Sequence, residues 1–266
     1  MKYCFIGIGN MASAIIGGMV KNGFEPKDIL CYNRTFKKAA DIAQKLGVTP
    51  VESIAEAVAQ ADAVVVSVIP QSFPQVLPEI KRSLKDNQPV ISIAAGRDIA
   101  YLKETLGENV PVVRVMPNVN AKVGASTTCF TPSDDVTEAH KDMVREIFGA
   151  VGELIELTED EFTPFKAIAG CGVAFAYMYI DACARAGVKY GLSKEKALAI
   201  AASTVMGSAK LVAESGEHPF ALIDQVTTPG GTTIEGIMSL QANGFEHAIH
   251  EAMRAVIEKD AVLSSK

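Results

Sequence analysis

Short apolar runs rich in β-branched residues alternate with helical periodicity through the first part of the chain. The runs that predict strands cover residues 2–6, 28–32, 61–68, 89–96, 110–116, 125–130 and 153–157. The segments that predict helices cover residues 11–22, 35–46 and 137–150. The run at 61–68 has the composition of a strand that is buried on both faces of a sheet. This alternation predicts an α/β fold, a doubly wound and mostly parallel Rossmann sheet with helices on both faces.

Long helical patterns replace the strands from about residue 161 onward. One helix is predicted over residues 162–190, weakened by Gly170 and Gly172, and Ser193 is placed as the N-cap of the next helix. We therefore predict two domains. Residues 1–160 form the Rossmann domain, and residues 161–266 form an all-α domain.

The second long helix, at residues 194–215, is apolar or small on nearly every face. A helix of this kind is usually buried, yet the second domain has too little chain to surround two such helices. A subunit interface would cover them, so we predict an obligate homodimer and leave a higher assembly of dimers open. Tight packing within the monomer is the alternative.

The composition is typical of a soluble globular protein, with 48% hydrophobic and 21% charged residues. No apolar run reaches the length of a membrane span, and the start lacks signal-peptide architecture, so we expect a cytoplasmic protein without a membrane partner. The net charge of −6 argues against nucleic acid. The five scattered cysteines predict free, buried thiols. His247 and His250 have no apparent third ligand, so no metal site is expected.

A glycine motif follows the first predicted strand and opens the first predicted helix. Gly7, Gly9 and Ala12 have the spacing G-x-G-x-x-A, which allows a tight turn, a close approach to a pyrophosphate, and packing of the helix on the sheet. We assign the whole turn, including Asn10 and Met11, to cofactor binding. A simple glycine turn is the alternative.

The end of the second strand indicates which dinucleotide binds. An acidic residue there would accept hydrogen bonds from the ribose hydroxyls of NAD, but this chain has Asn33, Arg34 and Thr35. Arg34 with two short polar side chains would hold the 2′-phosphate of NADP, whereas a carboxylate would repel it. We predict NADP(H), with NAD left open. In the alternative interpretation, Arg34 is an ordinary surface charge.

Three further strand ends carry small or rigid residues. Val68 and Pro70 follow the central strand, Ala95 and Gly96 follow the next, and Pro117 precedes Asn118 after the strand at 110–116. Cofactors of open α/β sheets bind at the carboxyl ends of strands. We assign the first five of these residues to cofactor binding and the amide of Asn118 to substrate binding, although strand ends that merely turn would look similar.

The segment TTPGGTTIEG, at residues 227–236, predicts the start of a helix. Thr232 and Glu235 have the spacing of a capping box, and the preceding Pro-Gly-Gly forms a turn. Backbone N–H groups that converge at such a helix start suit a small carboxylate. The hydroxyls of Thr228 and Thr233 add hydrogen-bonding groups. An ordinary capped turn is the alternative.

This segment also resembles the signature of the Δ1-pyrroline-5-carboxylate reductases, roughly D-x-V-x-[ST]-P-G-G-[TA]-T-I, at residues 224–234. The resemblance extends to FIGIGNMASAIIGG at the start, to AAG at 94–96, to RVMPN at 114–118 and to SGEHP at 215–219. It implies a Rossmann domain and a helical dimerisation domain. It also implies a site at the dimer interface and NADPH as hydride donor in the last step of proline biosynthesis.

The resemblance also assigns roles within the segment. The backbone of Gly231, Thr232 and Thr233 would hold the substrate carboxylate, and Thr233 would face the ring nitrogen as a catalytic residue. We place Gly230 and Thr228 among the substrate-binding residues.

Two departures from the family pattern concern the substrate. Val119 and Asn120 replace a Thr-Pro pair, and AGCGVAF at 169–175 replaces S-G-S-G-P-A-Y, so that Cys171 and Val173 stand where the family has serine and proline. Lys166 is also unusual, because the family more often has a small or polar residue there.

Lys166 therefore supports a second hypothesis. In the related β-hydroxyacid dehydrogenases, a lysine on the interdomain helix donates a proton. Lys166 could act as this acid in a β-hydroxyacid dehydrogenase or in a reductase of another imine, or it could be a solvated surface lysine. A non-catalytic NADP(H)-binding dimer that senses redox state is the third hypothesis.

Overall fold

The computed structural model describes residues 1–264, with side chains through residue 262. The chain forms two compact units. The first contains Met1–Gly170 together with the C-terminal residues from Lys259, and the second contains Cys171–Glu258. The unit limit at Gly170 falls inside the segment that we assigned to the helical domain, and our boundary at residue 160 remains a prediction.

The first unit contains one eight-stranded sheet in the order β3-β2-β1-β4-β5-β6-β7-β8. Neighbouring strands are parallel except for the antiparallel pair β6–β7, which confirms the predicted fold class. The strands are β1 (Tyr3–Ile6), β2 (Ile29–Tyr32), β3 (Thr49–Val51), β4 (Ala63–Val66), β5 (Val90–Ser92), β6 (Val112–Met116), β7 (Ser126–Pro132) and β8 (Gly152–Glu156). The sequence pattern did not predict β3. Its Pro50 is tolerated because β3 lies at the edge of the sheet.

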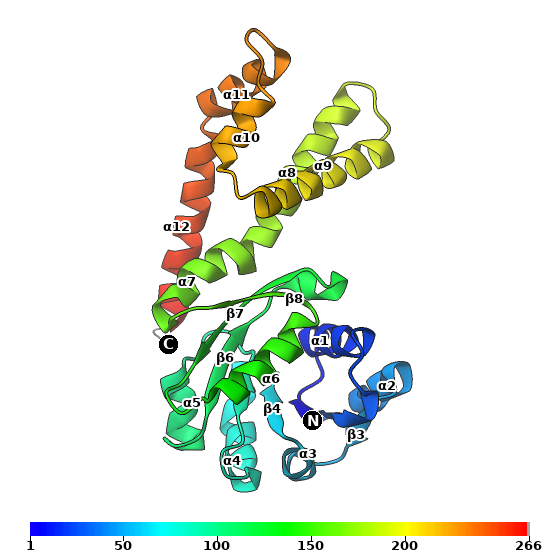
Figure 1. Cartoon of the computed structure of the whole chain (residues 1–266), viewed down its shortest axis with the longest axis vertical. Helices are drawn as coiled ribbons and strands as arrows, with labels where there is room; N and C mark the ends of the chain where they lie inside the picture. Colours follow the sequence, from blue (N-terminus) through cyan, green and yellow to red (C-terminus); the bar gives the residue numbers. More distant parts are fainter. Residues whose placement is uncertain (265–266) are drawn as a thin grey trace. The chain divides into compact units, whose positions relative to one another are not determined.

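Helices cover both faces of this sheet (Figure 1). On one face lie α1 (Asn10–Lys21), α2 (Phe36–Leu46) and α6 (Glu138–Gly149). On the other lie α3 (Ile54–Gln60), α4 (Phe73–Ser83) and α5 (Ile99–Leu106). Every residue of β1 and β4 is buried, as expected for central strands that are covered on both faces.

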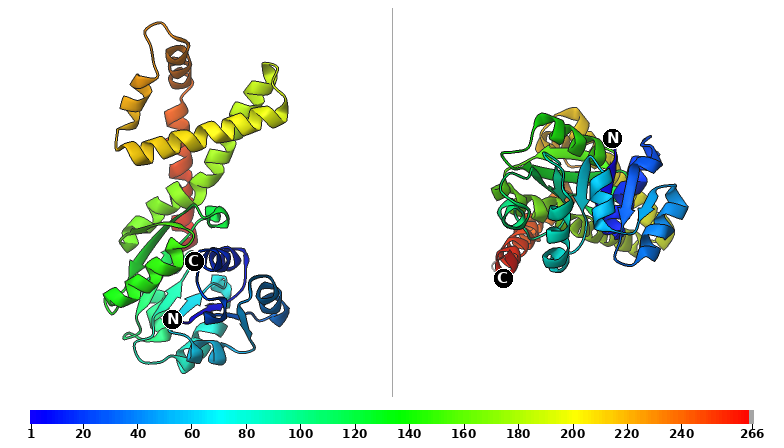
Figure 2. Two further views of the ribbon diagram at one scale, coloured as in Figure 1. Left: turned by 45° about the vertical axis from the view of Figure 1, so that its right-hand side comes forward. Right: turned by 90° about the horizontal axis from the view of Figure 1, so that it is seen from below.

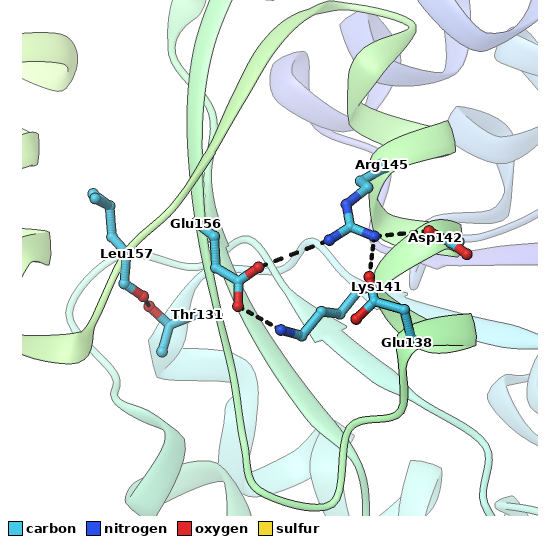
Figure 3. Close-up of polar contacts among 7 residues, drawn as sticks. All are labelled: Thr131, Glu138, Lys141, Asp142, Arg145, Glu156 and Leu157. Atoms are coloured by element: carbon cyan, nitrogen blue, oxygen red, sulfur yellow. Dashed lines mark hydrogen bonds and ion pairs between the residues drawn. The ribbon is translucent and has the colours of Figure 1, made fainter.

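Charged side chains of α6 hold the outer strand β8 (Figure 3). Lys141 and Arg145 both pair with Glu156 of β8. Thr131 of β7 donates a hydrogen bond to the Leu157 carbonyl, just beyond the end of β8. These side chains are partly exposed to solvent, so the ion pairs add little to stability.

The predicted helix over residues 162–190 is interrupted, so our prediction of one continuous helix is wrong. The structure has α7 (Phe162–Phe165), a π-helical segment at Lys166–Cys171, and α8 (Gly172–Lys189). Gly170 and Gly172 lower the helix propensity there. The Asn118 side chain also donates to the Ala169 carbonyl inside the π-helical segment, and side chains that enter a helix in this way distort it.

The second unit is helical. Its helices are α8, α9 (Lys194–Ser215), α10 (Pro219–Gln225), α11 (Thr232–Ala242) and most of α12 (Phe245–Ser264). Helices α8 and α9 form a hairpin, which Figure 2 shows from a second side. Ser193 caps α9 by accepting a hydrogen bond from the Lys196 N–H, as predicted.

The two long helical segments leave most of their apolar surface exposed in the single chain. Only 17% of the most apolar stretch of Glu159–Lys189 and 11% of that of Lys194–Ser215 are buried. Packing within the monomer therefore does not cover them. By length and composition alone both could cross a membrane, which corrects our expectation that no segment reaches that length. Core helices of soluble proteins meet the same criterion.

All five cysteines are free. Cys4, Cys31 and Cys129 are buried as expected, and burial raises the pKa of Cys31 to about 12. Cys171 is half-buried and Cys183 is exposed, so the expectation of buried thiols is wrong for these two in the single chain.

Candidate cofactor and substrate sites

The glycine loop after β1 requires glycine at its first position. Gly7 has φ of +105°, and a Cβ atom there would lie 2.5 Å from Val68 Cγ1 and 3.1 Å from the Ser67 backbone. The Gly7 N–H donates to the Tyr32 carbonyl at 2.8 Å. The chain therefore turns sharply against the end of β4, which only glycine permits.

The start of α1 is open to a phosphate. Gly9 is the N-cap residue and no side chain caps the helix. A Cβ atom on Gly9 would meet nothing within 4 Å, so space remains in front of the backbone. Asn10 is exposed and Met11 is half-buried, whereas Ala12 is buried against the sheet. The unpaired N–H groups of the first turn can bind a pyrophosphate.

Two side chains brace this loop. Asn33 accepts a hydrogen bond from the Ile8 N–H at 3.0 Å and donates to the Thr35 carbonyl at 3.0 Å. Ser67 donates to the Gly7 carbonyl at 2.7 Å. Asn33 thus supports the loop, in addition to its predicted cofactor role. We missed Ser67, although a serine at the end of a β-branched strand was a usable signal.

The sheet brings the predicted cofactor residues together at the carboxyl ends of its strands. Strands β1, β4, β5 and β6 are neighbours, and their carboxyl ends lead into the glycine loop, Val68, Ala95–Gly96 and Pro117. Pro70 begins a short 3-10 turn, Pro70–Ser72. The strand order reverses between β1 and β4, which is where open α/β sheets bind dinucleotides. Arg34 and Thr35 are exposed after β2, beside this switch point.

Asn118 is buried, and both polar atoms of its side chain form hydrogen bonds. Its side-chain N–H group donates to the Ala169 carbonyl at 3.0 Å, and its side-chain oxygen accepts from the Asn120 N–H at 3.1 Å. Its own backbone N–H donates to Ser126 Oγ at 3.0 Å. These contacts show a side chain that holds the loop after β6, and its predicted contact with substrate stays a prediction.

Lys166 is not a solvated lysine. Its ammonium group is hydrogen-bonded to Asp260 near the end of α12, and its side chain is 25% exposed. Thr163 donates to the other oxygen of Asp260 at 3.1 Å. A proton donor at this position would have to give up its bond to Asp260.

A polar cavity of about 310 Å³ adjoins Gly96 and Lys166. In the part of the chain whose side chains are described, the buried polar side-chain atoms without a hydrogen-bond partner are Arg97 Nε, Arg114 Nε and Glu159 Oε1. All three residues line this cavity. Such atoms are usually satisfied by water or by a bound molecule.

In the second unit, the turn before α11 also requires glycine. Gly230 has φ of +67°. A Cβ atom on Gly231 would lie 2.4 Å from Thr228 Oγ1 and 3.0 Å from the Thr228 carbonyl oxygen. The Gly231 N–H donates to that carbonyl at 2.9 Å, which closes the turn.

The predicted capping box of Thr232 and Glu235 is wrong. Gly231 has the extended backbone of the N-cap residue, and Thr232 is already the first residue of α11. No side chain caps α11, so the N–H groups of its first turn are unpaired. Thr232 and Thr233 are exposed. The open helix start is therefore available to a carboxylate.

The Rossmann sheet, the glycine loop at its switch point and the open α1 start define the class, the dinucleotide-dependent oxidoreductases. Family models match both parts of the chain. The model for NADP oxidoreductase, coenzyme F420-dependent, matches residues 2–96, and the model for pyrroline-5-carboxylate reductase dimerisation matches residues 159–263. A pyrroline-5-carboxylate reductase of Escherichia coli is 40% identical over 264 residues, covering 99% of this chain and 98% of that protein. The chain belongs to the pyrroline-5-carboxylate reductase family, which confirms the resemblance.

Other relatives agree. A pyrroline-5-carboxylate reductase of Arabidopsis thaliana is 35% identical over 99% of this chain and 95% of that protein. The solved structure of the reductase from Coxiella burnetii has a TM-score of 0.94 at 31% identity, covering 98% of both chains. The Plasmodium falciparum pyrroline carboxylate reductase, solved with NADP bound, has a TM-score of 0.87 at 30% identity, covering 99% of this chain and 98% of that one.

Proposed function

We propose that this chain reduces 1-pyrroline-5-carboxylate to L-proline with NADPH, the last step of proline biosynthesis. The observation that carries the proposal is the 40% identity to a pyrroline-5-carboxylate reductase over 99% of the chain, which includes both compact units. The matching solved structure with NADP supports the choice of cofactor.

The first unit binds the cofactor. The glycine loop and the unpaired N–H groups of α1 hold the pyrophosphate, and Arg34 with Thr35 holds the 2′-phosphate, since no acidic side chain follows β2 to repel it. Bound NADPH supplies the hydride that reduces the C=N bond. The residues at the ends of β4, β5 and β6 would hold the reactive ring of the cofactor.

The second unit binds the substrate. The N–H groups of Gly231, Thr232 and Thr233 at the start of α11 hold the carboxylate, and the hydroxyl of Thr228 adds a hydrogen bond. The Thr233 hydroxyl accepts a hydrogen bond from the protonated ring nitrogen, or relays to that nitrogen a proton that comes from water. The protonated imine is the better electrophile, and hydride addition to its carbon gives the amine. The chain's main contribution is alignment of the substrate, with little covalent chemistry.

We further propose a cytoplasmic homodimer. The exposed apolar surface of α8 and α9 lies within the segment that matches the dimerisation family model. A second copy of the chain is the partner that such a surface fits. An assembly of several dimers is compatible with this proposal.

The direct test is NADPH oxidation by the purified protein with 1-pyrroline-5-carboxylate. We expect turnover with NADPH and slower turnover with NADH, and no reduction of NADP⁺ by a panel of 3-hydroxyacids. Oxidation of a 3-hydroxyacid without imine reduction would support the dehydrogenase with Lys166 as acid. Tight NADPH binding with no turnover of any imine would support the redox sensor.

Replacing Thr233 with Ala tests the substrate site. We expect kcat to fall by about 10²-fold because a group that bonds the reacting nitrogen is lost. The Kd for NADPH, measured by fluorescence, should stay the same. Thr233→Ser is the matched control, since it keeps the hydroxyl and should keep most of the activity. Equal kcat in Thr233→Ala and the unmodified protein would remove Thr233 from the mechanism.

A further inference from the structure

The π-helical segment Lys166–Cys171 connects two groups of contacts within the first unit. Segments of this type are rare in proteins and are frequent at functional sites. At the start of the segment, Lys166 contacts Asp260. Near its end, the Ala169 carbonyl accepts a hydrogen bond from Asn118 at 3.0 Å. The segment thus lies between the end of α12 and the loop after β6.

Asp260 is a buried carboxylate, with 9% of its surface exposed. Lys166 binds one of its oxygens, and Thr163 donates to the other at 3.1 Å. A buried carboxylate that loses its partner is strongly unfavourable, so these contacts oppose any movement of the segment away from α12. The position of the segment start is therefore fixed by a residue almost a hundred positions later in the chain.

Helix α7 and Ala169 of the segment are packed against the sheet. Phe162, Phe165 and Ala169 form a buried apolar cluster with Cys129 of β7. Asn118 then connects Ala169 to the loop after β6, where its side-chain oxygen also accepts the Asn120 N–H. This loop begins at the edge of the sheet where the predicted cofactor residues meet.

We propose that Lys166 and Asp260 form a clasp that positions the active-site loop at residues 117–124. The clasp fixes the π-helical segment, and the segment fixes the loop through Asn118. Lys166 is thus a positioning residue instead of the proton donor. The catalytic part of this inference rests on the proposed function, and the structural part does not.

The chain offers a matched control pair. Lys103 of α5 pairs with Asp135, which follows β7. Because β7 is antiparallel to β6, Asp135 lies beside the amino end of β6, where Ser133 N–H bonds the Val112 carbonyl at 2.8 Å. This pair is also a lysine with an aspartate and also belongs to the first unit. It lies at the amino end of β6, whereas the predicted cofactor residues follow the carboxyl ends of the strands.

The test is a double-mutant cycle with Lys166→Met and Asp260→Asn. We expect each single variant to lower kcat for the imine about tenfold, since small misplacements of reacting groups can cost up to about 10²-fold. The double variant should be no slower than the slower single variant. The Kd for NADPH should stay within about twofold, because Pro117 is the one predicted cofactor residue inside the loop at 117–124, and the glycine loop and Arg34 lie outside it. Lys103→Met and Asp135→Asn should leave kcat unchanged.

Hydrogen exchange gives a measure that does not need turnover. The amides of residues 118–125 should exchange at least about tenfold faster in Asp260→Asn than in the unmodified protein, and not in Asp135→Asn. If the unmodified protein does not reduce the imine, the proposed function is wrong. The exchange rates still test whether Lys166 and Asp260 position the loop. Unchanged exchange and kcat in Asp260→Asn would overturn the proposal. So would full activity in Asp260→Asn with none in Lys166→Met, because Lys166 would then be the acid itself.

Discussion

The two compact units use apolar residues in different ways. In the first unit, the central strands β1 and β4 are buried on both faces by helices of the same chain. In the second unit, described in full, the buried apolar residues are three alanines, Ala184, Ala197 and Ala201. Met178 and Met206 are 76% and 70% exposed. The first unit completes its own core, and the second requires another surface to cover its apolar side chains.

The same contrast applies to the sites. In the first unit, the predicted cofactor residues follow the ends of neighbouring strands of one sheet. In the second unit, the predicted substrate site is the uncapped start of α11. The turn that precedes it contains Gly230 and Gly231. We expect changes on the exposed apolar faces of α8 and α9 to act through assembly, and changes in the first unit to act through local fit.

The largest effect is expected from a charge on α9. Met206→Lys would place an ammonium group in the proposed subunit interface, and an unpaired buried charge costs about 3–5 kcal/mol. Sedimentation velocity should show a dimer for the unmodified protein and a monomer for the variant. Ile155→Lys, on an exposed position of β8, is the control and should remain a dimer. A dimeric Met206→Lys variant would contradict the proposed interface.

The next effect distinguishes two glycines of the same loop. Gly7→Ala should lower the free energy of unfolding by about 2–3 kcal/mol, because the new Cβ atom would overlap Val68 at a positive φ. Gly9→Ala should leave stability within about 0.5 kcal/mol, because its Cβ atom meets nothing, but should weaken NADPH binding. Urea denaturation and fluorescence titration measure the two quantities. Equal stability of the two variants would show that the loop is more tolerant than the structure indicates.

The smallest effect is expected at the surface of the first unit. Glu156→Gln removes the ion pairs of Lys141 and Arg145 with β8 (Figure 3). Because all three side chains remain in contact with solvent, the loss should be below about 1 kcal/mol and should shrink in high salt. A loss of several kcal/mol in urea denaturation would mean that β8 depends on this network.

The sequence was sufficient for every strand of the sheet except β3, and for the turn of the glycine loop. β-Branched runs and the spacing of Gly7, Gly9 and Ala12 depend on local chemistry, and local chemistry can be recognised without the fold. The strand β3 was missed because it has only three residues and contains Pro50, which a pattern search rejects.

Two predictions for the helical part of the chain were wrong, one because of contacts distant in sequence and one because the sequence allows two helix starts. The π-helical segment depends on contacts of Asn118 and Asp260, which are distant in sequence from Lys166. The N-cap of α11 was misplaced by one residue, because the same letters allow a helix that starts after Gly231 or after Thr232. Only the extended backbone of Gly231 decides between them.

The most direct test of the whole account is a crystal structure of the protein with NADP⁺ and L-proline. We predict that the carboxylate of proline accepts hydrogen bonds from the N–H groups of Thr232 and Thr233 at the start of α11, with the ring nitrogen beside the Thr233 hydroxyl. Proline bound at another place, with the start of α11 unoccupied, would contradict the account of the substrate site.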